Sequence, residues 1–259
     1  MSGARTTTAR RQVRVSTEPS VGQKLIAEAL GTAFLTLIGC AAVTSTNMLM
    51  NADKAHPGLT QADLGIIGLA FAIALAISVY AIGKVSGCHI NPAITLGFLA
   101  TLRIEAWLAV LYIIAQFVGA TIAGLGILVI YGTQAATQTS MGVTSFAAPT
   151  AAWQAFVAEA IGTFIFMFVI TAMAADPRSP TGWAGLIIGL TLGGVIMMMG
   201  GVTGASLNPA RSFGPELIQS LFHGTVDWSQ YWVYLAGPIV GAVLGAFAYD
   251  FIAEPRKAG

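Results

Sequence analysis

The stretch SGCHINPAIT, residues 86–95, returns in the second half of the chain as TGASLNPARS, residues 203–212. In both copies Asn-Pro-Ala precedes an apolar run that is too short to cross a bilayer, at 93–100 and at 210–222. Asparagine is a good helix N-cap, and proline suits the first helical position because it lacks the backbone N–H. A single Asn-Pro pair often marks only a helix start in a loop. Two copies in matching contexts predict two related half-helices, beginning at Asn91-Pro92-Ala93 and Asn208-Pro209-Ala210.

The sequence around the two motifs is strongly apolar. Of the 259 residues, 56% are hydrophobic and 9% are charged, whereas about 25% of residues are charged in a typical soluble domain. A membrane span needs about 20 apolar residues, and six runs reach that length. These runs are 24–48, 64–84, 106–131, 152–174, 183–202 and 229–252. We therefore predict an all-α membrane protein with six transmembrane helices plus the two half-helices, re-entrant within the bilayer.

The two halves of the chain repeat each other beyond the motifs. AEALGT at 27–32 returns as AEAIGT at 158–163, and GATIAGL at 119–125 returns as GAVLGAF at 241–247. Each half contains three spans, and an odd number of spans makes the second repeat enter the membrane from the opposite face. The sequence thus predicts two inverted repeats.

The expected domain division follows from the spans and the repeats. The channel domain is expected to cover residues 24–252, with repeat one at 24–131 and repeat two at 152–252. Residues 1–23 and 253–259 are expected to be cytoplasmic tails, the first of them disordered. An Arg- and Thr-rich leader with few acidic residues is also the pattern of an organelle transit peptide.

Most Lys and Arg residues fall in segments that one orientation of the six spans places on the same side. They are Arg5, Arg10, Arg11, Arg14, Lys24, Lys84, Arg103, Arg178, Arg256 and Lys257. Cytoplasmic loops are enriched in Lys and Arg, so we expect both termini in the cytoplasm and segments 49–63 and 132–151 outside. The net charge of +1 and the scattered basic residues predict no nucleic-acid partner.

Laid end to end, the two half-helices would complete a seventh, broken span. Irregular backbone at membrane depth is tolerated only where protein buries it or where it lines a wet cavity. The loops before the half-helices are therefore expected to line a pore with carbonyl oxygens, at Gly87, Cys88 and His89 and at Gly204 and Ser206. Helix N-termini carry partial positive charge, so the midplane should repel cations and protons and pass neutral molecules that donate and accept hydrogen bonds, by a passive mechanism.

Several residues have two possible roles. Arg211 follows the second motif and is either a pore donor or a structural residue paired with Glu216 or a loop carbonyl. Glu28 and Glu159 occupy matching repeat positions, which favours structural acceptors for the amides of the irregular loops over a proton relay. His89 either lines the inner pore or packs through hydrogen bonds, and Cys88 either faces the pore, where mercurials would block it, or packs.

Other functional classes fit less well. A secondary transporter also uses inverted repeats and broken helices, and its coupling site would have to be Glu28 and Glu159. A structural junction or adhesion protein would form tetramers without flux. The sequence offers no nucleophile and base pair for an enzyme and no Cys, His and carboxylate cluster for a metal, so neither a metal nor a cofactor is expected.

Taken together, the doubled Asn-Pro-Ala, the inverted repeats and the Arg after the second motif resemble the aquaporin (major intrinsic protein) family over residues 24–252. The stretches SGCHINPAIT, YIIAQFVGA and AGPIVGAVLGA look similar to the archaeal aquaporin branch. The resemblance implies a homotetramer in the cell membrane in which each subunit has its own pore, with water and small neutral solutes as the permeants.

The resemblance also assigns an outer selectivity filter to Phe71, Ile196, Ala205 and Arg211. Strict water channels of the family usually have His in place of Ile196, and glycerol facilitators usually have Gly there and Trp in place of Phe71. The Asp that glycerol facilitators carry after the filter Arg is Ser212 here. The resemblance therefore implies water permeation with slower passage of glycerol, urea or hydrogen sulfide.

Overall fold

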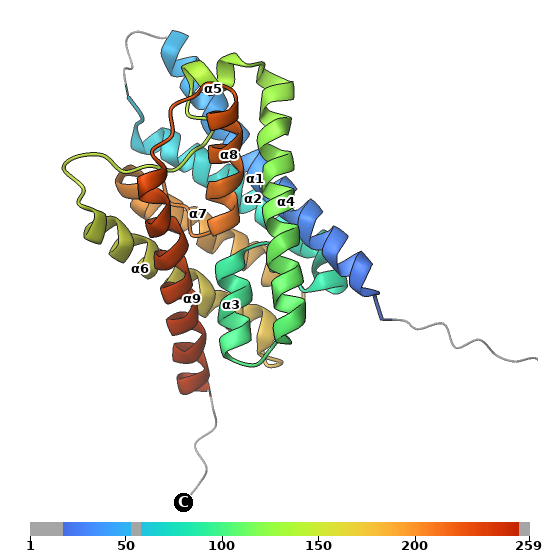
Figure 1. Ribbon diagram of the computed structural model, residues 1–259. Coiled ribbons are helices and arrows are strands. Elements are labelled where there is room, and N and C mark those ends of the chain that lie inside the picture. Colours follow the sequence, from blue (N-terminus) through green and yellow to red (C-terminus); the bar gives the residue numbers. More distant parts are fainter. Residues whose placement is uncertain (1–17, 53–57, 254–259) are drawn as a thin grey trace, which may run out of the picture.

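The computed structural model describes residues 18–52 and 58–253, and these contain six helices long and apolar enough to cross a membrane. They are α1 (Val21–Ala52), α2 (Gln61–Ser86), α4 (Ala106–Tyr131), α6 (Ala152–Ile170) with its π-helical turn η1 (Thr171–Ala175), α7 (Ala184–Thr203), and α9 (Tyr231–Ala253) with the preceding 3-10 turn η2 (Trp228–Gln230). The predicted six-span, all-helical architecture is confirmed (Figure 1). Most of both predicted tails, residues 1–17 and 254–259, lies outside the described residues.

Two short helices follow the Asn-Pro-Ala motifs, α3 (Pro92–Ala100) and α8 (Pro209–Leu221). Each has an extended Asn as N-cap and Pro in its first turn. The side-chain oxygen of Asn91 accepts the Ala93 N–H at 2.9 Å, and that of Asn208 accepts the Ala210 N–H at 3.1 Å. These contacts satisfy backbone donors that a helix start otherwise leaves without an acceptor.

The half-helices interlock the two repeats. α3 belongs to the first repeat and packs mainly against α9 of the second, while α8 belongs to the second repeat and packs mainly against α4 of the first. Figure 1 shows α8 and α3 one above the other between α4 and α9. Each half of the chain therefore completes the core of the other, as inverted repeats require.

Glycine allows the long helices to cross closely at equivalent places. A Cβ added at Gly119 on α4 would lie 2.1 Å from the Ala29 carbonyl oxygen on α1. A Cβ added at Gly241 on α9 would lie 2.1 Å from the Ala160 carbonyl oxygen on α6. Small residues at helix crossings let backbones approach within a membrane, so these two contacts set the spacing of α1 with α4 and of α6 with α9.

The connecting segments differ from the sequence expectations in two places. The predicted external segment 49–63 is shortened, because α1 continues to Ala52 and a capping box between Thr60 and Asp63 starts α2 at Gln61. Capping depends on hydrogen bonds at the helix end, and hydropathy does not report it. The segment 132–151 contains a short helix, α5 (Gln134–Gln138), which no apolar pattern indicated.

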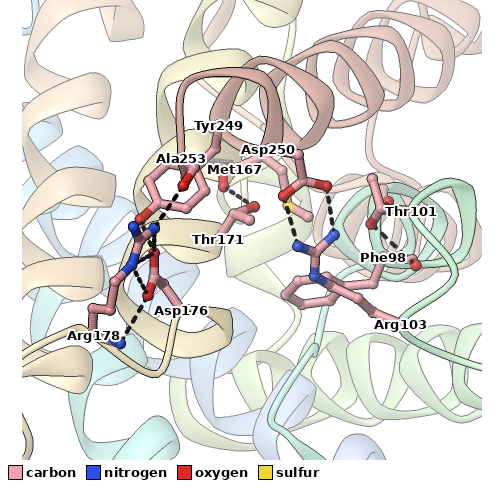
Figure 2. A network of polar contacts seen from close by, with 11 residues as sticks. Phe98, Thr101, Arg103, Met167, Thr171, Asp176, Arg178, Tyr249, Asp250 and Ala253 are labelled. Carbon is pink, nitrogen blue, oxygen red and sulfur yellow. Dashed lines mark hydrogen bonds and ion pairs between the residues drawn. The ribbon is translucent and has the colours of Figure 1, made fainter. Parts of the chain in front are cut away.

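A polar network ties the last turns of α9 to two loops at the end of the bundle where α3 terminates (Figure 2). The Arg103 guanidinium donates to both carboxylate oxygens of Asp250, at 2.8 and 2.6 Å. Asp176 accepts from the Tyr249 hydroxyl at 2.6 Å and from the Arg178 guanidinium. The bonds from Arg178 hold the pKa of the Asp176 carboxyl well below its usual range. This network fixes the ends of α3, η1 and α9 relative to one another.

Candidate pore and selectivity filter

The irregular segments before the half-helices adopt the same unusual backbone conformation. In the first, φ is 90° at Gly87, 53° at Cys88 and 42° at Ile90. The second segment matches it residue by residue, with φ of 74°, 47° and 55° at Gly204, Ala205 and Leu207. Residues other than Gly rarely adopt positive φ, and such conformations persist only where surrounding contacts fix them. Each segment must therefore be anchored from outside.

Glu28 provides the anchor for the first segment. Its carboxylate is fully buried and accepts the His89 N–H at 2.9 Å and the Ile90 N–H at 2.6 Å. The Ser86 hydroxyl and the Gln116 amide donate to the same group at 2.6 and 2.8 Å. A buried carboxylate is tolerated when donors surround it in this way.

Glu159 makes the equivalent contacts in the second repeat. It accepts the Ser206 N–H at 3.0 Å, the Leu207 N–H at 2.8 Å and the Thr203 hydroxyl at 2.7 Å. The carboxylate is also fully buried. Both acids thus receive the loop amide hydrogens that the repeat pattern assigned to them.

The two half-helix N-termini meet through their capping asparagines. The Asn91 side-chain amide donates to the Leu207 carbonyl at 2.7 Å, and the Asn208 amide donates to the Ile90 carbonyl at 2.9 Å. The sequence did not reveal this reciprocal pair of bonds. Because each amide nitrogen has two hydrogens, each asparagine retains one donor after bonding to the opposite loop.

Two cavities meet at this point. We call the one beside Cys88 the inner cavity, with a volume of about 40 Å³, and the one beside Arg211 the outer cavity, with a volume of about 10 Å³. Leu35, Asn91 and Phe166 line both. A cavity needs roughly 10–15 Å³ to hold one water molecule. The outer cavity therefore has room for about one water molecule, and the inner one has more space.

All four residues assigned to the filter line the outer cavity, although they come from four segments. Phe71 lies on α2, Ile196 on α7, Ala205 in the second irregular segment and Arg211 on α8. The Arg211 guanidinium carbon is 4.9 Å from the centre of the Phe71 ring. The structure thus brings the four residues together; their role in selection stays a prediction.

Arg211 combines the two alternatives considered for it. Its side chain lines the outer cavity and is 3% exposed. It also donates from Nη1 to the Gly142 carbonyl of the segment 132–151 at 2.6 Å. Within residues 18–52 and 58–253 it forms no ion pair with Glu216. A loop carbonyl therefore holds the guanidinium beside the outer cavity, and no carboxylate of the described part of the chain forms an ion pair with it.

The remaining loop residues divide between cavity lining and packing. Gly87, Cys88 and His89 line the inner cavity. His89 also packs, with its Nδ1 at 3.2 Å from the Thr95 hydroxyl and its ring 4.9 Å from that of Phe98. Ser206 lines the outer cavity, whereas Gly204 ends α7 and lies against Thr144 of the segment 132–151. Cys88 is 8% exposed.

An apolar wall faces the two irregular segments, and the sequence reading did not name its members. They are Leu35, Leu75, Val79, Phe166, Ile170, Ala174, Ile188 and Leu192. Leu35 follows Glu28 at the same spacing as Phe166 follows Glu159. The internal repeat therefore contained a signal for this pair, because equivalent positions of inverted repeats face each other at the midplane.

Comparisons with known proteins agree with this arrangement. The family described as "Major intrinsic protein" matches residues 15–249. "Aquaporin AqpM" of Methanothermobacter thermautotrophicus is 43% identical over 242 residues, covering 90% of this chain and 98% of that protein. "Glycerol uptake facilitator protein-like 6" of Lactiplantibacillus plantarum is 38% identical, covering 87% of this chain and 95% of that protein.

A solved structure shares the fold. The aquaglyceroporin from Plasmodium falciparum superposes with a TM-score of 0.76 at 26% identity, covering 90% of this chain and 97% of that one. The resemblance to aquaporins, including archaeal ones, is confirmed. This chain belongs to the major intrinsic protein family.

Proposed function

We propose that this protein is a passive transmembrane channel for water and small neutral solutes and that it excludes protons and ions. The observation that carries the proposal is the meeting of two half-helix N-termini through Asn91 and Asn208. Each asparagine keeps one amide hydrogen for a permeant oxygen. Membership of the major intrinsic protein family, whose members are channels, excludes an enzyme.

Fixed positive charge supports the exclusion of cations. Each half-helix contributes about half an elementary charge at its N-terminus, and both N-termini lie at the junction of the two cavities. Arg211 adds a full charge at the outer cavity. A hydrated proton or a metal cation would be repelled both at the half-helix N-termini and at Arg211. A neutral molecule instead exchanges its hydrogen bonds with water for hydrogen bonds with amide and carbonyl groups.

The outer cavity supports water as the faster permeant. Its volume of about 10 Å³ is close to that needed for one water molecule. Ile196 and Phe71 give it an apolar side where the alkyl part of a small alcohol can lie, and Arg211 supplies a donor for an oxygen. We propose that glycerol, urea or hydrogen sulfide passes more slowly than water.

The contacts of the buried acids argue against a coupled transporter. Glu28 and Glu159 were the only candidates for its coupling site, and both accept hydrogen bonds from the backbone of the irregular segments. A carboxylate that took up and released a proton or sodium ion in each cycle would repeatedly lose these anchors. Their contacts therefore favour a fixed channel.

Orientation, assembly and domain limits are also part of the proposal. The positive-inside pattern supports cytoplasmic termini, and Arg103 and Arg178 occur together at one end of the bundle. Family membership supports a homotetramer with one pore in each subunit, located in the cell membrane. We place the channel domain at residues 24–252, between a tail of residues 1–23 and another of 253–259.

The decisive experiment compares osmotic water and glycerol fluxes of proteoliposomes by stopped-flow light scattering. Wild-type vesicles should shrink faster than empty ones under an impermeant osmolyte, and glycerol should enter them more slowly than water. Ile196→His should lower glycerol flux relative to water, because it puts a polar, bulkier ring against the outer cavity. Water flux no faster than that of empty vesicles would refute channel function.

A further inference from the structure

Glu216 is a buried acid on α8, behind the outer cavity. It takes part in none of the pore contacts described above. Its side chain is 2% exposed, and its Oε2 has no hydrogen-bond partner among the described residues. The Oε1 atom lies 3.4 Å from the Thr144 hydroxyl of the external loop. An ionised carboxylate buried with so few donors is strongly unfavourable. Several donors surround Glu28 and Glu159, and this contrast indicates that Glu216 differs from them in its protonation state.

A chain of hydroxyl groups leads from Glu216 to the pore wall. The Thr144 hydroxyl oxygen lies 2.7 Å from that of Ser212, which lies 2.6 Å from that of Ser206. Ser206 lines the outer cavity and donates to the Asn208 carbonyl at 3.0 Å. The chain thus joins α8, the external loop and the second irregular segment.

The number of hydroxyl hydrogens in this chain determines which group donates at the Glu216 end. Four oxygen contacts link Glu216 to the Asn208 carbonyl, but Thr144, Ser212 and Ser206 supply only one hydroxyl hydrogen each. The carbonyl only accepts, so Ser206 must donate to it. Ser212 must then donate to Ser206 and Thr144 to Ser212, which leaves no hydrogen for the contact with Glu216.

An ionised Glu216 is incompatible with this sequence of donors and acceptors, because it has no hydrogen to donate to Thr144. If Thr144 donated to the carboxylate, the single Ser212 hydrogen would have to serve two contacts of 2.6 and 2.7 Å. One pair of oxygens would then face each other through lone pairs alone. Reversing the whole chain restores those contacts but removes the Ser206 bond to the Asn208 carbonyl. Only a hydrogen on Glu216 satisfies all four contacts.

We propose that Glu216 is a protonated, neutral acid that donates to Thr144 and so positions the hydroxyl chain behind the outer cavity. Through Thr144 it also holds the external loop whose Gly142 carbonyl fixes Arg211. Glu216 is thus a positioning residue for the outer constriction. This inference rests on the proposed channel function and adds a determinant of solute selectivity to it.

The surroundings of Glu216 agree with a neutral acid. The charged or titratable groups near it are Arg211 on its own helix and Tyr231 and Tyr234 on α9. Among the described residues none of these three forms an ion pair with Glu216. A neutral Glu216 leaves the Arg211 charge uncancelled at the outer cavity, where that charge repels cations.

Infrared spectroscopy of the full-length protein in lipid tests the protonation directly. The wild type should show the carbonyl stretch of a protonated carboxyl at neutral pH, and Glu216→Gln should remove that component. Glu105→Gln serves as the control, because Glu105 is an exposed carboxyl at the other end of the bundle, beside α4. If the protonated-carboxyl band is the same in the wild type and in Glu216→Gln, Glu216 is ionised and the proposal is wrong.

Flux measurements test the positioning role in the same vesicles. Glu216→Gln keeps a donor toward Thr144, so its glycerol-to-water permeability ratio should match the wild type. Glu216→Ala removes the donor and should change that ratio by about twofold to tenfold, the effect of one hydrogen bond. An unchanged ratio in Glu216→Ala would refute the positioning role. These outcomes concern a ratio in conducting vesicles, so they differ from the absence of water flux that would refute the channel itself.

Discussion

Replacing Glu159 tests how the irregular pore segments are held. Its carboxylate accepts the Ser206 N–H, the Leu207 N–H and the Thr203 hydroxyl at 3.0, 2.8 and 2.7 Å. In Glu159→Leu all three donors lose their acceptor inside the protein. Each unsatisfied buried donor costs about 1–3 kcal/mol, so the total is about 3–9 kcal/mol. A native domain is stable by only about 5–15 kcal/mol, and we expect this variant to fold poorly or not at all.

Glu159→Gln is the informative variant because it keeps the shape and one acceptor. Its Oε1 can still serve Ser206 and Thr203, but its amide nitrogen would face the Leu207 N–H, where Oε2 now accepts at 2.8 Å. One donor is left unsatisfied, which costs about 1–3 kcal/mol. Leu207 has a φ of 55° and depends on this anchor, so the carbonyl that receives the Asn91 amide should shift and water flux should fall.

The assays are thermal unfolding in detergent and osmotic water flux in vesicles. The order of stability should be wild type, then Glu159→Gln, then Glu159→Leu. Glu28→Gln should behave like Glu159→Gln, since Glu28 accepts the equivalent His89 and Ile90 amides. Glu105→Gln, at an exposed position, should have no effect. Wild-type melting temperature together with wild-type flux in Glu159→Gln would refute the anchoring role of the buried acids.

Three further predictions concern other parts of the molecule. Gly119→Ala should destabilise the protein by about 1–3 kcal/mol in thermal unfolding, because its Cβ would meet a carbonyl oxygen of α1 at 2.1 Å; Gly194→Ala, with open space at that position, is the control. Cys88 lines the inner cavity, so mercurials should block water flux and Cys88→Ser should relieve the block; equal inhibition of both would place the thiol outside the path. The bonds from Arg178 depress the pKa of Asp176. Their contribution to stability is therefore present at neutral pH and is lost as pH falls below the ordinary Asp value of about 3.9. In Asp176→Asn this acid-dependent loss should disappear from melting curves, and its persistence would contradict the stabilising role of the bonds between Arg178 and Asp176.

The sequence predicted the parts of this fold that a local pattern encodes. Hydropathy located six spans, and the doubled Asn-Pro-Ala with its N-cap and N1 signals located both half-helices. The repeat predicted that Glu28 and Glu159 serve equivalent loops. These features were accessible because helix starts and inverted repeats leave their signature within short stretches of sequence.

The sequence did not reveal contacts made between distant segments. The bonds from Asn91 to Leu207 and from Asn208 to Ile90 cross from one repeat to the other. The Gly142 carbonyl that holds Arg211 comes from a connecting segment with no apolar period. Such contacts depend on the packed arrangement of the helices, so single-sequence patterns carry no direct signal for them.

We expect selectivity to arise where the two repeats differ. The buried acids and the capping asparagines are the same in both halves and build a symmetric centre. Three residues after Asn91 the chain has Ile94, which lines the inner cavity, whereas three residues after Asn208 it has Arg211, which lines the outer one.

The volumes of the two cavities also differ between the half that contains Ile94 and the half that contains Arg211. The half with the apolar residue has about 40 Å³ of space, and the half with the Arg has about 10 Å³. We therefore expect permeants to be selected mainly in the outer half, where a fixed charge and the smaller cavity coincide. Substitutions at symmetry-breaking positions should change which solutes pass, whereas substitutions at positions shared by both repeats should decide whether a pore forms.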